Sequence, residues 1–365
     1  MKEYANLYIH VPFCRRKCGY CAFYSLPCAD DGLYQLWLEK LLLDLRKNAP
    51  GLQKIRTLYF GGGTPSSLPV PVLKKLFRTI QETCRFDPGA EITMEANPET
   101  VTTELCDTAA GFINRVSMGV QSFQPELRRA VMRHTGGTEH VCHALEAWRS
   151  AGVENLGFDL LYALPGETLV MFRNDLEEAL SCGVKHLSCY SITPEEGTPF
   201  AATGYEPDEG LSADMWNLAG EFLARHDMPR YEISNYASKP FRAAHNWNVW
   251  HGESYLGLGP SAASFDGVRR WTERDDLQQW AAGVSPVYDE IPRAERLREI
   301  LLMGLRTADG WGRGEFRSVT GVDPDFPVLA ALEREKLLLR GDDGVILPTE
   351  QGLLFWNDLA LRILE

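Results

Sequence analysis

The sequence predicts an α/β protein: a partial TIM-like barrel of six βα units, followed by an extension and a small winged-helix-like α+β domain. Three observations predict this arrangement. Apolar strand-like runs alternate with amphipathic helical segments from residue 7 to residue 191, which is typical of parallel strands joined by right-handed crossovers. The pattern then changes near residue 291 to helices around one hairpin. A length of 365 residues also favours more than one domain.

Each element of the barrel follows from its local pattern. The first strand, at 7–11, is an apolar run that Pro12 ends. The helix at 31–48 places Leu33, Trp37 and Leu41 on one face. Further strands are predicted at 55–60, 90–95, 113–118, 155–162 and 185–191, and further helices at 69–83, 102–110, 125–151 (a helical pair) and 168–181. Six units are too few for a closed eight-stranded barrel, and functional residues are expected on the loops that follow the strands.

The carboxyl-terminal part is predicted to contain helices at 293–306, near 327–336 and at 350–363, with a hairpin formed by 337–340 and 345–347. We therefore expect a core domain at 1–235, a barrel-closing segment at 236–290 and a winged-helix-like domain at 291–365. Residues 291–365 carry 10 Lys and Arg against 13 Asp and Glu, so DNA binding by the hairpin is not expected.

Composition excludes several classes of protein. The formal charge of −13 disfavours binding to nucleic acid or to anionic lipid. No apolar run reaches the length of a transmembrane helix, and the first residues lack the apolar region of a signal peptide, so a cytoplasmic location is expected. Nine cysteines, an odd number, argue for reduced thiols rather than a disulfide framework.

Three of these cysteines form a motif. Cys14, Cys18 and Cys21 have the spacing CxxxCxxC on the loop after the first strand. A structural zinc site prefers four ligands, which Cys28 or a histidine could complete. Three thiolates on a [4Fe–4S] cluster would instead leave one iron open for a ligand. The cations at 15–17 would offset the negative charge of a thiolate cluster, or they form a solvated basic turn.

Polar motifs follow the later strands. The second strand ends in Gly61-Gly62-Gly63-Thr64, which is not a phosphate-binding Walker loop because no Gly-Lys-Ser/Thr follows. Consecutive glycines allow backbone groups to approach a ligand closely. The next three strands end in the segments 95–98, 115–123 and 158–168. Because the ends of parallel strands share one edge of the sheet, these segments favour a single site.

The motif CxxxCxxC after a first strand resembles the radical S-adenosylmethionine (SAM) superfamily, which implies a radical SAM barrel. In that superfamily the amino and carboxylate groups of SAM bind the open iron, and an electron from the cluster cleaves the sulfonium. The resemblance implies that Cys14, Cys18 and Cys21 bind the cluster and that Tyr20 lines the adenine pocket.

The segments together resemble a narrower family, the oxygen-independent coproporphyrinogen III oxidases and the related HemW-type haem chaperones. This resemblance covers nearly the whole chain and implies one or two bound SAM molecules. Residues matched to the cluster-bound SAM are Tyr8, Gly62 and Glu95. Residues matched to a second SAM are Gly63, Thr64, Gln121, Arg133 and Asp159. The glycine-rich stretch 255–263, which includes Ala263, is expected to close over the SAM site.

Three features favour the chaperones within this family. The oxidases have a further cysteine where this chain has Phe23, and they carry an extension before the first strand, where this chain has six residues. The segment 245–250 resembles the HNxxYW motif linked to haem binding, with Val249 in place of Tyr. His245 is the haem-ligand candidate, because histidine is a competent axial ligand; His251 and Cys189 are weaker candidates.

The expected function is therefore that of a HemW-like chaperone that binds a [4Fe–4S] cluster, SAM and haem and delivers haem to acceptor proteins. The alternative is a radical SAM enzyme acting on a porphyrin, as an oxidase or a methyltransferase, and a third reading is a zinc-binding structural module. Expected partners are haem, a haem acceptor and a reductant such as flavodoxin or ferredoxin. No nucleic acid is expected, and membrane contact is expected only through a partner.

Overall fold

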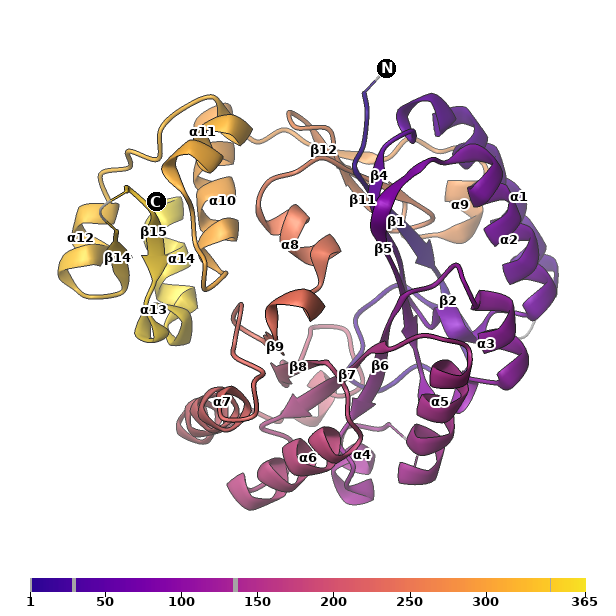
Figure 1. The fold of residues 1–365 in the computed structure, drawn as a ribbon, viewed down its shortest axis with the longest axis horizontal. Helices are drawn as coiled ribbons and strands as arrows, with labels where there is room; N and C mark the ends of the chain where they lie inside the picture. Colours follow the sequence, from indigo (N-terminus) through magenta and orange to yellow (C-terminus); the bar gives the residue numbers. More distant parts are fainter. Residues whose placement is uncertain (1, 28–30, 134–136, 342) are drawn as a thin grey trace.

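A computed structural model describes residues 2–27, 31–133, 137–341 and 343–365. Within these ranges an eleven-stranded sheet forms the centre of the molecule, in the order β13-β12-β11-β10-β1-β4-β5-β6-β7-β8-β9 (Figure 1). The six predicted strands are all present and parallel: β1 (Asn6–Val11), β4 (Ile55–Gly62), β5 (Phe86–Ala96), β6 (Arg115–Gln121), β7 (Asn155–Tyr162) and β8 (His186–Ser191). The sheet curves without closing, as expected from six βα units.

Helices follow these strands and cover the outer face of the sheet (Figure 1). They are α1 (Asp31–Asn48), α2 (Val70–Thr83), α3 (Thr103–Ala109), α4 (Pro125–Ala130), α5 (Thr138–Ser150), α6 (Leu169–Ser181) and α7 (Glu209–Ala224). The helical pair predicted at 125–151 is therefore confirmed as α4 and α5. The apolar stripe of α1 is buried as predicted: Trp37 and Leu41 are inaccessible, and the Trp37 indole donates to the backbone oxygen of His10 at 3.1 Å.

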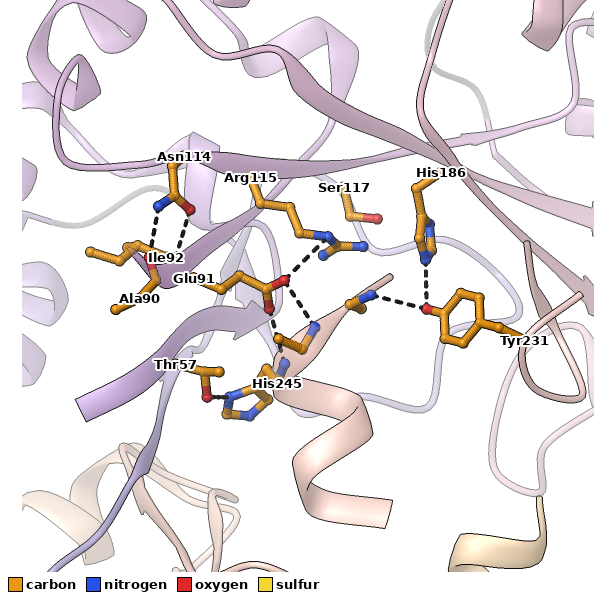
Figure 2. Close-up of polar contacts among 12 residues, drawn as sticks. Thr57, Ala90, Glu91, Ile92, Asn114, Arg115, Ser117, His186, Tyr231 and His245 are labelled. Atoms are coloured by element: carbon orange, nitrogen blue, oxygen red, sulfur yellow. Dashed lines mark hydrogen bonds and ion pairs between the residues drawn. The ribbon is translucent and has the colours of Figure 1, made fainter. Parts of the chain in front are cut away.

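One strand begins later than its sequence suggests, for a visible reason. Asn114 was expected inside the strand at 113–118, but its side-chain amide pairs with the backbone of β5. Its Oδ1 accepts from Ile92 N and its Nδ2 donates to Ala90 O, both at 2.8 Å (Figure 2). The Asn114 side chain thus makes the hydrogen bonds to β5 that its backbone would make in a strand, and β6 starts at Arg115.

The segment after β8 extends the sheet at both edges, which the sequence analysis did not predict in detail. β10 (Tyr255–Leu258) pairs parallel to β1 and adds a seventh parallel strand, with Asn6 opposite Tyr255. The antiparallel strands are β9 (Asn235–Ala237), β11 (Ala263–Phe265), β12 (Arg270–Thr272) and β13 (Val287–Asp289). Two short helices belong to the same segment, α8 (Ala244–Trp250) and α9 (Leu277–Ala281).

The carboxyl-terminal elements lie across the molecule from α1, α2 and α3 (Figure 1). They are α10 (Arg293–Leu305), α11 (Arg313–Thr320), α12 (Leu329–Arg334), the antiparallel pair β14 (Leu338–Arg340) and β15 (Ile346–Pro348), α13 (Glu350–Leu354) and α14 (Trp356–Leu364). The single helix predicted at 350–363 is wrong: Phe355, with ψ of 36°, separates two helices. These elements bury their own apolar cluster, which includes Trp311, Phe316 and Leu338. The domain boundaries at 235 and 290 stay predictions.

No helix in the described ranges combines the length and apolar composition needed to cross a membrane.

Candidate functional site

The cysteine loop is anchored at both ends beside the carboxyl end of β1. The short parallel pair β2 (Phe13–Cys14) and β3 (Leu26–Pro27) closes the loop. Under it, the ring of Phe13 packs against Trp37 with centroids 5.9 Å apart. Other parts of the chain pack against Gly19 of the loop. Phe200 N donates to Gly19 O at 2.8 Å, and a Cβ at Gly19 would lie 2.6 Å from the Cβ of Met132. The loop is therefore a packed element of the fold.

The three thiols of this loop lie in different environments. Cys14 is buried, with Sγ 3.2 Å from Thr64 Oγ1, whereas Cys18 and Cys21 are half-exposed. The Cys21 amide donates to Cys18 O at 3.3 Å, which folds the loop back on itself. Burial raises the pKa of the Cys14 and Cys21 thiols. Free thiolates are thus disfavoured here, and bound metal would supply the positive charge that stabilises them.

A buried guanidinium lies beside the thiols, where an anionic [4Fe–4S] cluster would need a cation. Among the described residues, no three His, Cys, Asp or Glu side chains converge on one point that could hold a metal ion. A [4Fe–4S] cluster does not require such convergence, because each thiolate binds a different iron. Arg133 is 7% exposed, its Nη1 lies 3.5 Å from Cys18 Sγ, and its Nε is buried with no hydrogen-bond partner in the described chain. This guanidinium can offset the charge of an anionic group at the loop.

The glycine-rich end of β4 lies against the same loop. Gly63 N donates to Val11 O at 2.8 Å and Thr64 N donates to Phe13 O at 2.7 Å. A Cβ at Gly63 would lie 2.5 Å from Phe13 O, so only glycine fits there. Gly62 has a φ of +107°, and its amide donates to Glu95 Oε2 at 3.2 Å. Two predicted SAM contacts, Gly62 and Glu95, are thus in direct contact.

Glu95 is a half-buried carboxyl whose charge depends on its surroundings. Its second oxygen accepts a hydrogen bond from the Tyr59 hydroxyl at 2.8 Å. Burial raises the pKa of Glu95 to about 7, with Asp159 adding to the rise and the Tyr59 hydroxyl opposing it. A cationic amino group placed beside this carboxyl would favour its ionised form. Such a group is present on SAM, so the chemistry of Glu95 fits the predicted contact.

The remaining predicted SAM contacts lie on β6, β7, β11 and the cysteine loop. Asp159 on β7 accepts from Ser117 Oγ on β6 at 3.1 and 3.2 Å, and burial raises the Asp159 pKa despite bonds from Ser117 and Ser188. Gln121 ends β6 with a φ of 71°, after a register shift that marks a bulge. Burial also raises the pKa of Tyr20, which lies beside the Arg133 guanidinium. Ala263 begins β11, two strands from β1.

His10, which no sequence motif singled out, connects the cysteine loop to β1. Its Nε2 is 3.0 Å from Tyr24 O and therefore donates to it, so Nδ1 accepts from the Tyr8 hydroxyl, also at 3.0 Å. Tyr24 belongs to the cysteine loop, and Tyr8 is a predicted SAM contact. The alternation of side chains along β1 puts Tyr8 and His10 on one face, and that pattern was the available signal. The glycine-rich stretch 255–263 reaches the site through Gly259, where a Cβ would lie 2.6 Å from His10 O.

His245 lies at the other end of the strands, close to the first residues of β1 and β4. Its imidazole is 6% exposed, and Nδ1 is 2.7 Å from the Thr57 hydroxyl (Figure 2). Its backbone amide and that of Ala244 donate to the Glu91 carboxylate at 3.0 and 2.9 Å, and Glu91 pairs with buried Arg115 (Figure 2). His245 therefore anchors α8 to the base of the barrel, remote from the cysteine loop.

The hydrogen bonds around His245 determine its tautomer. Asn6 Nδ2 donates to Glu253 Oε2 and Ser254 O, each at 3.1 Å, so Asn6 Oδ1 is free to accept. Thr57 donates its single hydroxyl hydrogen to Asn6 Oδ1 at 2.8 Å and must accept one from His245 Nδ1. Burial, with a smaller contribution from Arg115, lowers the His245 pKa to about 3. The imidazole is therefore neutral with a lone pair on Nε2, the form that binds iron.

Comparison with known proteins agrees with this geometry. The radical SAM superfamily model matches residues 8–179. The "Heme chaperone HemW" of Bacillus subtilis is 30% identical to this chain, with 97% of each protein covered. That of Escherichia coli is 33% identical, with 97% of this chain and 96% of the relative covered.

A solved structure extends the similarity to the fold. The coproporphyrinogen III oxidase HemN of Escherichia coli superposes with a TM-score of 0.84 at 22% identity, over 99% of this chain and 90% of that one. At this level of identity the match shows the fold alone, and it confirms the predicted radical SAM barrel. The full-length relatives show that the chain belongs to the HemW family of radical SAM proteins.

Proposed function

We propose that this protein binds a [4Fe–4S] cluster at Cys14, Cys18 and Cys21, binds SAM beside it, and carries haem to acceptor proteins. The main support is the contact of the cysteine loop with the glycine-rich end of β4, where Cys14 meets Thr64 and Gly62 meets Glu95. When bound, the cluster would supply an electron to the sulfonium of SAM. The haem-chaperone part rests on the full-length similarity to proteins that carry that name.

The residues of the chain would divide the work of holding SAM. Glu95 would take the amino group, since a cation restores the charge that burial suppresses. The backbone of Gly62 and Gly63 permits close approach because neither carries a Cβ. Tyr8 and Tyr20 are the predicted neighbours of the cofactor, and Arg133 would balance the charge at Cys18. Gln121 and Asp159 are the proposed contacts of a second SAM, and Ala263 that of the closing stretch.

His245 is the proposed haem ligand, and its tautomer supports this role because Nε2 keeps its lone pair. In this conformation the imidazole of His245 projects from α8 against Thr57 of β4 and is buried there, and a porphyrin is far larger than a single side chain. Haem binding at His245 therefore requires α8 to leave the base of the barrel.

Anaerobic reconstitution with iron and sulfide tests the cluster. We expect about four irons per chain in the parent protein and loss of the cluster in Cys14→Ala, Cys18→Ala and Cys21→Ala. Cys142→Ala, at an exposed thiol of α5, is the matched control. Cys28→Ala is expected to keep its iron, although Cys28 lies outside the described residues. One bound zinc and no iron would contradict the proposal.

Haem titration and haem transfer test the haem-chaperone part of the proposal. We expect stoichiometric haem binding, transfer of haem to an acceptor protein, and no product from coproporphyrinogen under strict anaerobiosis. His245→Ala should weaken the haem titration. Turnover of the porphyrin would instead assign the protein to the enzyme alternative.

A further inference from the structure

A small pocket of about 100 Å³ lies where the end of α8, the edge strands of the sheet and α10 meet. Its wall includes Val249 at the end of α8, Phe265 of β11 and Ile300 of α10. Arg270 of β12 and Arg296 of α10 line the same pocket, so two guanidinium groups lie beside apolar side chains. This volume can hold a small polar group of a ligand, but it is far too small for a whole porphyrin.

The guanidinium of Arg296 is buried and only partly hydrogen-bonded. The residue is 7% exposed, and its Nη1 donates to Glu299 Oε2. Its Nη2 lies 3.7 Å from Asp289 Oδ2, which is beyond hydrogen-bond distance. Nε and Nη2 are both buried and have no hydrogen-bond partner among the described residues. A buried charged donor without an acceptor is costly, so these two atoms favour a ligand that brings acceptor oxygens.

The carboxylates near Arg296 are engaged with other donors. Glu299 accepts from Arg296 through Oε2 and from Arg270 through Oε1, and Asp289 accepts from Arg270. The ion pairs of the pocket are therefore balanced, and a ligand would be held by directed hydrogen bonds rather than by excess charge. Nε and Nη2 form one edge of the guanidinium and present two parallel N–H groups. This arrangement binds both oxygens of one carboxylate.

The pocket is close to the proposed haem ligand. His245 and Val249 are four residues apart on α8, so they lie on the same face and about 6 Å apart along the helix axis. α8 lies between α10 and the strands β1 and β4 (Figure 1). The carboxyl end of α8 is attached to the carboxyl-terminal elements, because His251 Nε2 lies 3.2 Å from Gly310 O. His245 would therefore stay beside α10 when α8 leaves the barrel.

We propose that Arg296 binds a propionate carboxylate of the haem whose iron binds His245. This proposal deepens the proposed function and rests on it. The propionates extend from one edge of the porphyrin, so a carboxylate can enter the pocket beside Val249 while the ring stays outside, along α8. Nε and Nη2 of Arg296 would each donate a hydrogen bond to this carboxylate, and no covalent bond or proton is transferred.

Titration of the parent protein with haem and with haem dimethyl ester tests this proposal without any substitution. The ester keeps the iron and the ring but has no carboxylate. The parent should bind haem at least about tenfold more tightly than the ester, because buried hydrogen bonds between charged groups are strong. Equal affinities would overturn this proposal alone. Absence of haem binding by the parent would contradict the proposed function, and this proposal would fall with it.

The variant Arg296→Lys tests whether this side chain causes the difference. Lysine keeps the charge but lacks the two parallel donors, so haem should bind about tenfold more weakly than to the parent, and the ester should bind equally to both proteins. Arg298→Lys is the matched control, because Arg298 lies on the same helix and donates to Leu364 O. It should keep the parent affinities. An equal loss of affinity for haem and ester in Arg296→Lys would show a structural role and overturn the assignment.

Sodium propionate distinguishes a haem propionate from a small unattached carboxylate, which has the same chemistry. At high concentration it should weaken haem binding to the parent but not to Arg296→Lys, with sodium chloride as the control for ionic strength. Unchanged haem affinity in propionate would overturn the assignment to haem. Stabilisation of the parent by propionate in thermal melts would then identify a small carboxylate as the ligand of the pocket.

Discussion

Replacement of Gly62 by alanine tests the reasoning about the site most directly. A Cβ at this position would lie 2.5 Å from His10 Cε1 and 2.7 Å from Nδ1, and the backbone already has a φ of +107°. Gly259, the residue after β10, packs against the backbone and Cβ of His10 and so limits how far His10 can shift, because a Cβ at Gly259 would lie 2.6 Å from His10 O and 3.1 Å from His10 Cβ. To admit the methyl group, His10 must give up its contacts to Tyr8 and to Tyr24.

The expected cost can be summed from these contacts. An unfavourable positive φ costs about 1 kcal/mol, and each of the two lost hydrogen bonds costs about 1 kcal/mol. Gly62→Ala should therefore lower the free energy of unfolding by about 3 kcal/mol. Gly89→Ala is the matched control, because Gly89 has a φ of +78° with nothing within 4 Å of the added Cβ. It should lose only the backbone contribution, about 1 kcal/mol.

Urea unfolding of both variants measures the difference, with reconstituted iron as a second readout. Gly62→Ala should also bind less iron and SAM, since Tyr24 lies in the cysteine loop, whereas Gly89→Ala should bind both normally. Equal destabilisation of the two variants would refute the argument that His10 holds the loop and Tyr8 together.

Two further predictions concern other parts of the fold. Burial raises the pKa of the Glu167 carboxyl to about 8, above its unfolded value of 4.5, so its contribution to stability is present below pH 4.5 and is lost as the pH rises through 8. Within this window the free energy of unfolding of Glu167→Gln should therefore rise relative to that of the parent by about 1.4 kcal/mol per pH unit. A constant difference between the two proteins in thermal melts from pH 5 to 8 would contradict the assignment. Thr57→Val leaves the buried His245 Nδ1–H without an acceptor and should cost about 1–3 kcal/mol in urea unfolding. If His245 binds haem, the same variant should bind haem more tightly than the parent, and weaker binding would exclude release of α8 as the entry route.

The sequence predicted the barrel well because its strands and helices carry their patterns locally. α1 and β7 have the predicted bounds, at Asp31–Asn48 and Asn155–Tyr162. β10 has no comparable pattern: Tyr255-Leu256-Gly257-Leu258 is too short to show a periodicity and becomes a parallel strand by pairing with the edge of β1. The break at Phe355 likewise escapes a periodicity argument, since the apolar spacing continues across it.

Residues of the candidate site that belong to a sequence motif could be predicted. Residues whose role depends on a contact between distant parts of the chain could not. The spacing of the cysteines and the glycines of β4 identified the loop and Gly62. The role of His10 depends on Tyr24 O, on the cysteine loop fourteen residues away, and no local pattern reports it. The surroundings of His245 depend on Thr57 and Glu91, which lie more than 150 residues earlier in the chain.

The place of β1 in the sheet has a consequence for how the protein folds during its synthesis. β1 pairs on one side with β4 and on the other with β10. The second pairing, which places Asn6 opposite Tyr255, cannot form until Tyr255 has been synthesised. At a synthesis rate of about 5–20 residues per second, translation of the intervening segment lasts roughly 10–50 s. During this time one edge of an apolar strand stays open next to the ribosome, where it can recruit another chain. The edge of β1 that pairs with β10 therefore stays unpaired until the last parallel strand has been synthesised.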